Sequence, residues 1–144
     1  MSLRAKQLMS ERISVAPDMT VKDAARKMMA FGQPGLPVVN EKMEVLGVVS
    51  EFNVLGAIRE GMNLSEATVA RIMTAKPATA DIESTSEDLI QMMLLNNFTF
   101  IPIVNKNKYA GMVSRQMIMD ACVSPDYNAF SYREQKDLCA CACH

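Results

Sequence analysis

The stretch Gly47-Val48-Val49-Ser50-Glu51-Phe52-Asn53 places a serine where a strand-like apolar run gives way to polar residues. Such a serine is a good N-cap for a following helix, because its hydroxyl accepts a hydrogen bond from a backbone N–H of the first turn. The start of a helix also attracts anions, since its first N–H groups are unpaired and the helix dipole is positive there. Ser50 is therefore predicted to be either a plain helix cap or part of an anion-binding site.

A second set of reactive side chains lies at the end of the sequence, where three cysteines alternate with alanine before the only histidine. The set consists of Cys139, Cys141, Cys143 and His144. Thiolates and imidazole are suitable ligands for Zn²⁺ or Cu(I), although this spacing is unlike that of a zinc finger. Metal or thiol binding through these residues is one hypothesis, and an incidental tail is the other.

The sequence contains none of the common catalytic signatures. It has no P-loop, no Gly-x-Gly-x-x-Gly motif and no internal histidine that could act as the base for a nucleophilic serine. The lone His144 is poorly placed to be oriented by packed neighbours. We therefore expect a protein that binds a ligand and is not an enzyme.

Charge and hydropathy exclude two further classes of partner. Fifteen basic and sixteen acidic residues give a net charge of −1, whereas nucleic-acid binding needs a clustered positive surface. The apolar runs are shorter than the roughly 20 residues that cross a bilayer, and the first residues lack the apolar stretch of a secretory signal. The sequence predicts no nucleic acid, no membrane and a cytoplasmic location.

An internal duplication organises the chain. Segments that begin at residues 8 and 47 recur, with similar residues, 64 positions later at residues 72 and 111. Two pairs of segments repeat at this offset: Leu8-Met9-Ser10 with Ile72-Met73-Thr74, and Gly47-Val48-Val49-Ser50 with Gly111-Met112-Val113-Ser114. Between them, Leu36-Pro37-Val38-Val39 matches Ile101-Pro102-Ile103-Val104 at an offset of 65. We interpret residues 3–61 as the first repeat, 62–123 as the second and 124–144 as a C-terminal tail.

Each repeat predicts the same order of elements. Thr20 with Asp23, and Thr85 with Asp88, have the spacing of an N-cap and the third helical residue. Two apolar runs joined by a polar turn then predict a β-hairpin, and Ser50 or Ser114 begins a second helix. The fold class is therefore α/β (α+β), with two βαββα repeats. A half-size unit is marginal alone, so the two are expected to share a core.

The repeated segments resemble the CBS domain, named for cystathionine beta-synthase, over nearly all of residues 3–123. The shared features are the Met-Ser/Thr openings, the capped helix, the Leu/Ile-Pro-Val/Ile-Val strand and the Gly-x-x-Ser strand end, in the same order twice. The resemblance implies two repeats packed about a pseudo-twofold axis and a homodimer. It also implies a cleft for an adenosine-containing ligand such as AMP, ADP, ATP or S-adenosylmethionine, with no cofactor required.

The resemblance implies a ligand role for the Gly-x-x-Ser-x-x-Asp pattern, in which the hydroxyl and helix start bind phosphate and the aspartate binds ribose hydroxyls. Asn53 stands at the aspartate position of the first repeat and Met117 at that of the second. Asparagine can still hydrogen-bond a ribose, whereas methionine cannot usefully do so. The better predicted cleft comprises Ser50, Asn53, Ala78, Thr79, Thr99, Phe100, Ile101 and Pro102.

A second and weaker cleft is predicted around the other serine. Its residues are Ser14, Val15, Gly35, Leu36, Pro37, Ser114 and Arg115. The Arg115 guanidinium could reach a phosphate there, but Met117 supplies no ribose contact.

The predicted function is a regulatory module that binds an adenosine-containing nucleotide between its repeats and signals to an unidentified regulated protein by changing shape. One alternative is a structural dimerisation module with degenerate clefts, which the substituted aspartate positions favour. The other is metal or thiol binding through the cysteine-rich tail.

Overall fold

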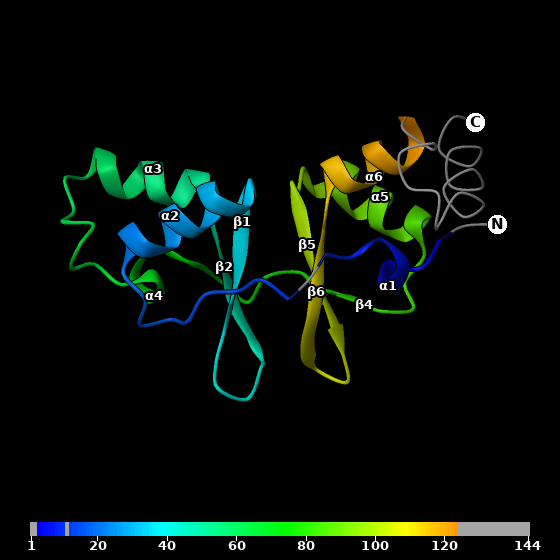
Figure 1. The fold of residues 1–144 in the computed structure, drawn as a ribbon, viewed down its shortest axis with the longest axis horizontal. Coiled ribbons are helices and arrows are strands. Elements are labelled where there is room, and N and C mark those ends of the chain that lie inside the picture. The colour runs from blue at the N-terminus through cyan, green and yellow to red at the C-terminus, as the bar shows by residue number, and fades with distance from the viewer. Residues whose placement is uncertain (1–2, 11, 124–144) are drawn as a thin grey trace. The chain divides into compact units, whose positions relative to one another are not determined.

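The chain folds into two units in a computed structural model, which describes residues 3–10 and 12–123 (Figure 1). The first unit contains Arg12–Ala78 and Lys106–Tyr109. The second unit contains the described residues of Met1–Glu11, Thr79–Asn105 and Ala110–His144. Among the described residues, no helix combines the length and apolarity needed to span a membrane.

The first unit carries a three-stranded sheet in the order β1-β2-β3. Its elements in chain order are α2 (Val21–Phe31), β1 (Gly35–Val39), β2 (Val45–Ser50), α3 (Glu51–Arg59), α4 (Val69–Ile72) and β3 (Thr74–Ala75). Both β1 and β3 run antiparallel to β2. The extended lead-in before α2 is reduced to one parallel bridge between Val15 and Val38.

The second unit repeats this plan with the sheet order β4-β5-β6. Its elements are α1 (Ala5–Leu8), β4 (Ala80–Asp81), α5 (Ser86–Asn96), β5 (Phe100–Asn105), β6 (Lys108–Ser114) and α6 (Arg115–Val123). The first two residues of β6, Lys108 and Tyr109, belong to the first unit. Strand β4 pairs in parallel with β5, as the Val15 lead-in does with β1. The predicted mixture of helices and strands, with an extended lead-in, helix, hairpin and helix in each copy, is confirmed.

The predicted helix caps are present. The Asp23 N–H donates to Thr20 Oγ1 over 3.2 Å, and the Asp88 N–H donates to Thr85 Oγ1 over the same distance. Both helices end at a residue in the left-handed conformation, Gly32 after α2 and Asn97 after α5. These caps fix where the two helices begin and end.

The two repeats exchange their opening segments. The Met9-Ser10 opening of the first repeat lies in the second unit, where the Ser10 N–H donates to Met112 O over 3.0 Å. The Met73-Thr74 opening of the second repeat lies in the first unit, where Thr74 pairs with Val48. The first sheet is therefore completed by a strand of the second repeat, and β6 of the second sheet is contacted by the opening of the first repeat.

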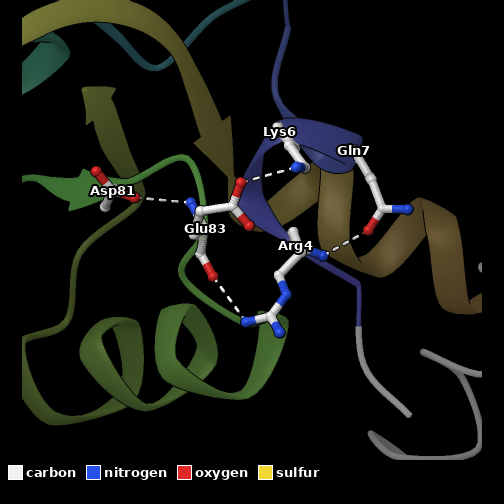
Figure 2. Close-up of polar contacts among 5 residues, drawn as sticks. All are labelled: Arg4, Lys6, Gln7, Asp81 and Glu83. Carbon is white, nitrogen blue, oxygen red and sulfur yellow. Dashed lines mark hydrogen bonds and ion pairs between the residues drawn. The ribbon is translucent and has the colours of Figure 1, made fainter. Parts of the chain in front are cut away.

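A polar cluster ties α1 to the loop that follows β4 (Figure 2). Lys6 Nζ forms an ion pair with Glu83 Oε1 at 2.7 Å, and Arg4 Nη1 donates to Glu83 O at 2.9 Å. The Glu83 N–H in turn donates to Asp81 Oδ2. Because these side chains are exposed, each contact contributes less than about 1 kcal/mol to the stability of the fold. The cluster helps to orient α1, whose Ala5 is fully buried in the core.

Candidate functional site

Ser50 and Asn53 form a reciprocal cap at the start of α3. The Asn53 N–H donates to Ser50 Oγ at 3.3 Å, while Asn53 Oδ1 accepts from the Ser50 N–H at 2.8 Å and from Ser50 Oγ at 3.0 Å. The predicted capping role of Ser50 is confirmed. Its role in binding a ligand stays a prediction.

The cap leaves specific hydrogen-bond donors unused. The Glu51 N–H donates to Pro34 O at 3.1 Å, so among the described residues the Phe52 N–H is the first-turn donor without a partner. The half-buried Asn53 also has an Nδ2 amino group that makes no hydrogen bond within the described chain. The junction between β2 and α3, at Ser50–Asn53, can therefore donate hydrogen bonds to an anion or to a hydroxyl oxygen. The Asn53 Oδ1 acceptor is already engaged by Ser50.

The equivalent junction in the second unit uses sulfur in place of the amide oxygen. The Met117 N–H donates to Ser114 Oγ at 3.2 Å, and the Ser114 N–H donates to Met117 Sδ at 3.5 Å. Ser114 is buried, whereas Arg115 is exposed. A thioether is a weak acceptor and no donor, so this junction offers a ligand the Arg115 guanidinium and little else.

Residues assigned to different predicted clefts lie together within the first unit. Gly35 pairs with Ser50 across β1 and β2, and Val15 donates to Pro37 O at 3.0 Å. Ser50 and Asn53 of the better predicted cleft thus share a unit with the second-cleft residues Ser14, Val15, Gly35, Leu36 and Pro37. Ala78 also belongs to this unit.

The second unit likewise contains members of both predicted sets. The Arg115 N–H donates to Thr99 O at 3.0 Å, which joins the start of α6 to the residue before β5. This unit holds Thr79, Thr99, Phe100, Ile101 and Pro102 of one set with Ser114 and Arg115 of the other. A cleft built from both units remains a prediction.

Lys27 is a candidate site residue that the sequence analysis did not identify. Its Nζ donates to Ser14 O at 2.6 Å, and no carboxylate of the described chain lies within ion-pair distance of this half-buried ammonium. The second repeat has Met92 at the matching helix position, 65 residues further on, where it packs against the core. The sequence signal that could have identified Lys27 is that the first repeat has a charged residue at a position where the second repeat has an apolar one.

Tyr109 fixes the backbone next to Ser14. Its hydroxyl donates to Ile13 O at 2.8 Å, and its side chain is 2% exposed. Burial raises the pKa of Tyr109 well above its usual range, although the positive charge of Arg12 acts in the opposite direction. The lead-in segment of the first unit is therefore held by a neutral, buried phenol.

The predicted ligand set Cys139, Cys141, Cys143 and His144 lies outside the described residues. Within residues 3–10 and 12–123, no three Cys, His, Asp or Glu side chains are grouped as metal ligands would be.

Comparison with known proteins gives two matches to the family model described as CBS domain, at residues 5–60 and 69–124. Homoserine O-acetyltransferase of Methanococcus vannielii is 28% identical over 100 residues, which cover 69% of this chain and 20% of that enzyme. The chain therefore spans about a fifth of the length of this relative.

Solved structures share the fold. CBSX2 in complex with AMP is 23% identical, with a TM-score of 0.74 and coverage of 85% of this chain and 98% of that one. The CBS domain pair of MJ0100, in complex with 5′-methylthioadenosine and S-adenosyl-L-methionine, is 20% identical, with a TM-score of 0.74 and coverage of 83% and 94%.

Proposed function

Since the chain belongs to the CBS domain family, with two copies of the domain, we propose that it is a regulatory module that binds an adenosine-containing nucleotide. In this proposal the protein is a cytoplasmic homodimer without catalytic activity. Occupancy of the cleft is passed to a regulated protein because the ligand has a higher affinity for one shape of the module than for another. Two proteins of the same fold in complex with AMP, or with S-adenosyl-L-methionine and 5′-methylthioadenosine, support this class of ligand.

The observation that carries the proposal is the pair of unused donors at the start of α3. The Phe52 N–H lies at the positive end of the helix dipole and suits a phosphate oxygen. The Nδ2 group of Asn53, the next residue, suits a ribose oxygen. These donors favour the predicted cleft at Ser50 and Asn53 over the cleft at Ser114, where Met117 offers no donor.

The geometry also refines how a ribose would be bound. Because Asn53 Oδ1 already accepts two hydrogen bonds from Ser50, the ribose oxygen must accept from Nδ2. A single neutral hydrogen bond of this kind contributes about 1 kcal/mol. We therefore expect modest affinity at this position.

A structural dimerisation module is the second candidate function. It is favoured by the same cap, because Ser50 and Asn53 are fully explained by helix capping if no ligand binds. In that case both junctions only start helices, and the clefts are degenerate.

Calorimetric titration of AMP, ADP, ATP and S-adenosylmethionine into the wild-type protein separates the two candidates. We expect at least one ligand to bind and Asn53→Ala to weaken binding about fivefold, which corresponds to about 1 kcal/mol. Asn53→Asp should hold or improve affinity, because its second carboxylate oxygen can accept a hydrogen bond from a ribose hydroxyl in place of the lost Nδ2 donor. Met117→Ala is the control at the second junction and should leave the affinity unchanged. The titration is run well below the melting temperature, since Asn53→Ala also removes cap contacts that stabilise α3.

Two outcomes contradict the proposal. Equal affinity in wild type, Asn53→Ala and Asn53→Asp would reject the assigned residues. The absence of binding by all four ligands would leave the structural candidate.

A further inference from the structure

Met73 joins α4 to strand β3 in the first unit. Its N–H donates to Val69 O at 2.9 Å, which ends α4, and the next residue, Thr74, pairs with Val48 of β2. Its side chain lies against Gly47 of β2, since a Cβ built on that glycine would be 2.8 Å from Met73 Sδ and 3.2 Å from its Cγ. The thioether therefore packs on bare backbone, in the space that a side chain would otherwise occupy.

Met9 has the equivalent position in the second unit. Its N–H donates to Ala5 O at 2.8 Å, which ends α1, and the N–H of the next residue, Ser10, donates to Met112 O in β6. A Cβ built on Gly111 would lie 3.1 Å from Met9 Sδ and 3.2 Å from its Cγ. The duplication has thus placed one methionine sulfur against one strand glycine in each unit.

Exposure to solvent distinguishes these two methionines from others in the described chain. Three methionines are at most 5% exposed and are closed to an oxidant in solution: Met28, Met93 and Met112. Met29 and Met119 are 73% and 58% exposed, so a change in their polarity disturbs little packing. Met9 and Met73 are half-buried. A small oxidant can reach them, and their sulfur atoms also hold a segment against a strand.

Oxidation changes both the shape and the polarity of this contact. A hydroperoxide such as H₂O₂ transfers one oxygen to the thioether: the sulfur supplies an electron pair, an S–O bond forms, the O–O bond breaks and water leaves. The resulting sulfoxide is polar, whereas the thioether packs as an apolar group. Because the contact with each glycine lacks room even for a Cβ carbon, the added oxygen cannot be placed between the sulfur and the strand.

We propose that Met9 and Met73 make the two opening segments sensitive to oxidation. When a hydroperoxide converts these residues to the sulfoxide, the Ser10 segment separates from β6 and β3 separates from β2. Reduction of the sulfoxide by methionine sulfoxide reductases restores the thioether and both contacts, so the response is reversible. The inference does not depend on the nucleotide or the homodimer of the proposed function, because each contact lies within one unit.

Hydrogen–deuterium exchange resolved at single amides tests this inference in the full-length protein. The Ser10 N–H donates to Met112 O and the Lys76 N–H donates to Leu46 O, so both report on the attached segments. We expect treatment with H₂O₂ to speed exchange of these two amides at least about threefold, because detachment leaves them open to water. The Val39 N–H, which donates to Val15 O, is the internal reference and should be unchanged.

Peptide mapping by mass spectrometry verifies which methionines are oxidised. Catalase then removes the peroxide, and dithiothreitol returns reversibly oxidised cysteines to thiols but leaves methionine sulfoxide in place. Treatment with methionine sulfoxide reductases A and B should return exchange to the rate of the untreated protein. Both enzymes are needed because each reduces one sulfoxide epimer.

Two single substitutions separate the contributions of the units. Met73→Leu keeps an apolar side chain of similar volume but has no sulfur to oxidise, and it should abolish the peroxide response at Lys76 while the response at Ser10 remains. Met9→Leu should have the opposite effect. Circular dichroism verifies that each variant is folded.

Two further variants serve as control and mimic. Met29→Leu with Met119→Leu removes two exposed sulfur atoms and should leave the peroxide response at both amides unchanged. Met73→Gln introduces a polar side chain of similar length, and it should speed exchange at Lys76 before any oxidant is added.

Three outcomes overturn the inference. Exchange at Ser10 and Lys76 that stays the same after Met9 and Met73 are oxidised would show that the segments tolerate the sulfoxide. A full response at Lys76 in Met73→Leu would mean that another oxidised residue causes it. Failure of the reductases to restore slow exchange, with both sulfoxides reduced, would show damage and not a reversible response.

Discussion

Single residues in this chain combine structural and candidate binding roles. Ser50 and Asn53 cap α3 through three mutual hydrogen bonds, yet Asn53 keeps a free amino group. The serine caps could be predicted because capping depends on residues three positions apart. The contacts of Lys27 and Tyr109 could not be predicted, because their partners Ser14 and Ile13 lie 13 and 96 residues away in the sequence.

At the residue scale, the buried phenol of Tyr109 should make the folded protein less stable at alkaline pH. Burial raises its pKa in the folded protein, so the unfolded chain releases the phenol proton first, near pH 10. Its contribution to stability is fully present below about pH 10 and is lost as the pH rises further, by up to about 1.4 kcal/mol per pH unit. Tyr109→Phe should cost about 1 kcal/mol at pH 8, since the bond to Ile13 O is lost, and the gap to wild type should narrow at pH 10.5.

Urea unfolding of wild type and Tyr109→Phe at both pH values measures this effect. Lysines also titrate in this range, but they are common to both proteins. A gap of the same size at pH 8 and pH 10.5 would show that the phenol ionises as readily in the folded state as in the unfolded chain.

At the scale of elements, sequence spacing predicted the hairpin of each repeat, the helices before and after it and their caps, because these depend on local periodicity and turn residues. Helix α1 was not predicted. Strand β3 of the first sheet and the contact of Ser10 with β6 were not predicted. Strand β3 and the Ser10 segment carry little local signal, and only pairing with Gly47–Val48 or Met112 gives them an extended partner. The sequence could assign the expected cleft residues to particular helices and strands. It could not show which unit each residue belongs to, because the units are assembled through these long-range pairings.

Gly47 and Gly111, at matching positions of the two repeats, leave no room for a side chain where they contact Thr74 and Ser10. A Cβ on Gly47 would lie 2.6 Å from Thr74 O, and a Cβ on Gly111 would lie 2.6 Å from Ser10 O. Gly47→Ala and Gly111→Ala should each cost about 1–3 kcal/mol, because a backbone oxygen cannot move aside without disturbing the edge pairing. The control is Gly56→Ala within α3, where a Cβ meets no atom within 4 Å; it should stabilise the protein by about 0.5–1 kcal/mol.

Chemical denaturation of the three variants measures these changes in the free energy of unfolding. Wild-type stability in Gly47→Ala and Gly111→Ala would mean that the neighbouring segments move aside at little cost.

At the scale of the molecule, the N-terminal segment belongs to the second unit. The Ala5 N–H donates to Ser84 O, and the Ser86 N–H donates to Leu3 O, both at 2.8 Å. Deletion of residues 1–8 should therefore destabilise the second unit selectively, because it exposes the core that Leu3 and Ala5 cover.

Hydrogen–deuterium exchange measured by mass spectrometry separates the two units. We expect faster exchange in β5 and β6 of the deletion variant and little change in β1 and β2. Lys6→Ala, which removes only the exposed ion pair with Glu83, is the control and should alter exchange only locally. Faster exchange confined to β1 and β2 would contradict the assignment of this segment.

The exchange of opening segments has a consequence for synthesis of the chain on the ribosome. The first sheet is complete only after Thr74 has been made, and the outer side of β6 is covered only after Met112 has met Ser10, which was made near the start. Closing so long a loop is entropically costly and slow. We expect each newly made repeat to keep an open strand edge until its distant segment arrives, so the nascent chain is most prone to aggregation between the emergence of β2 and the docking of Ser10.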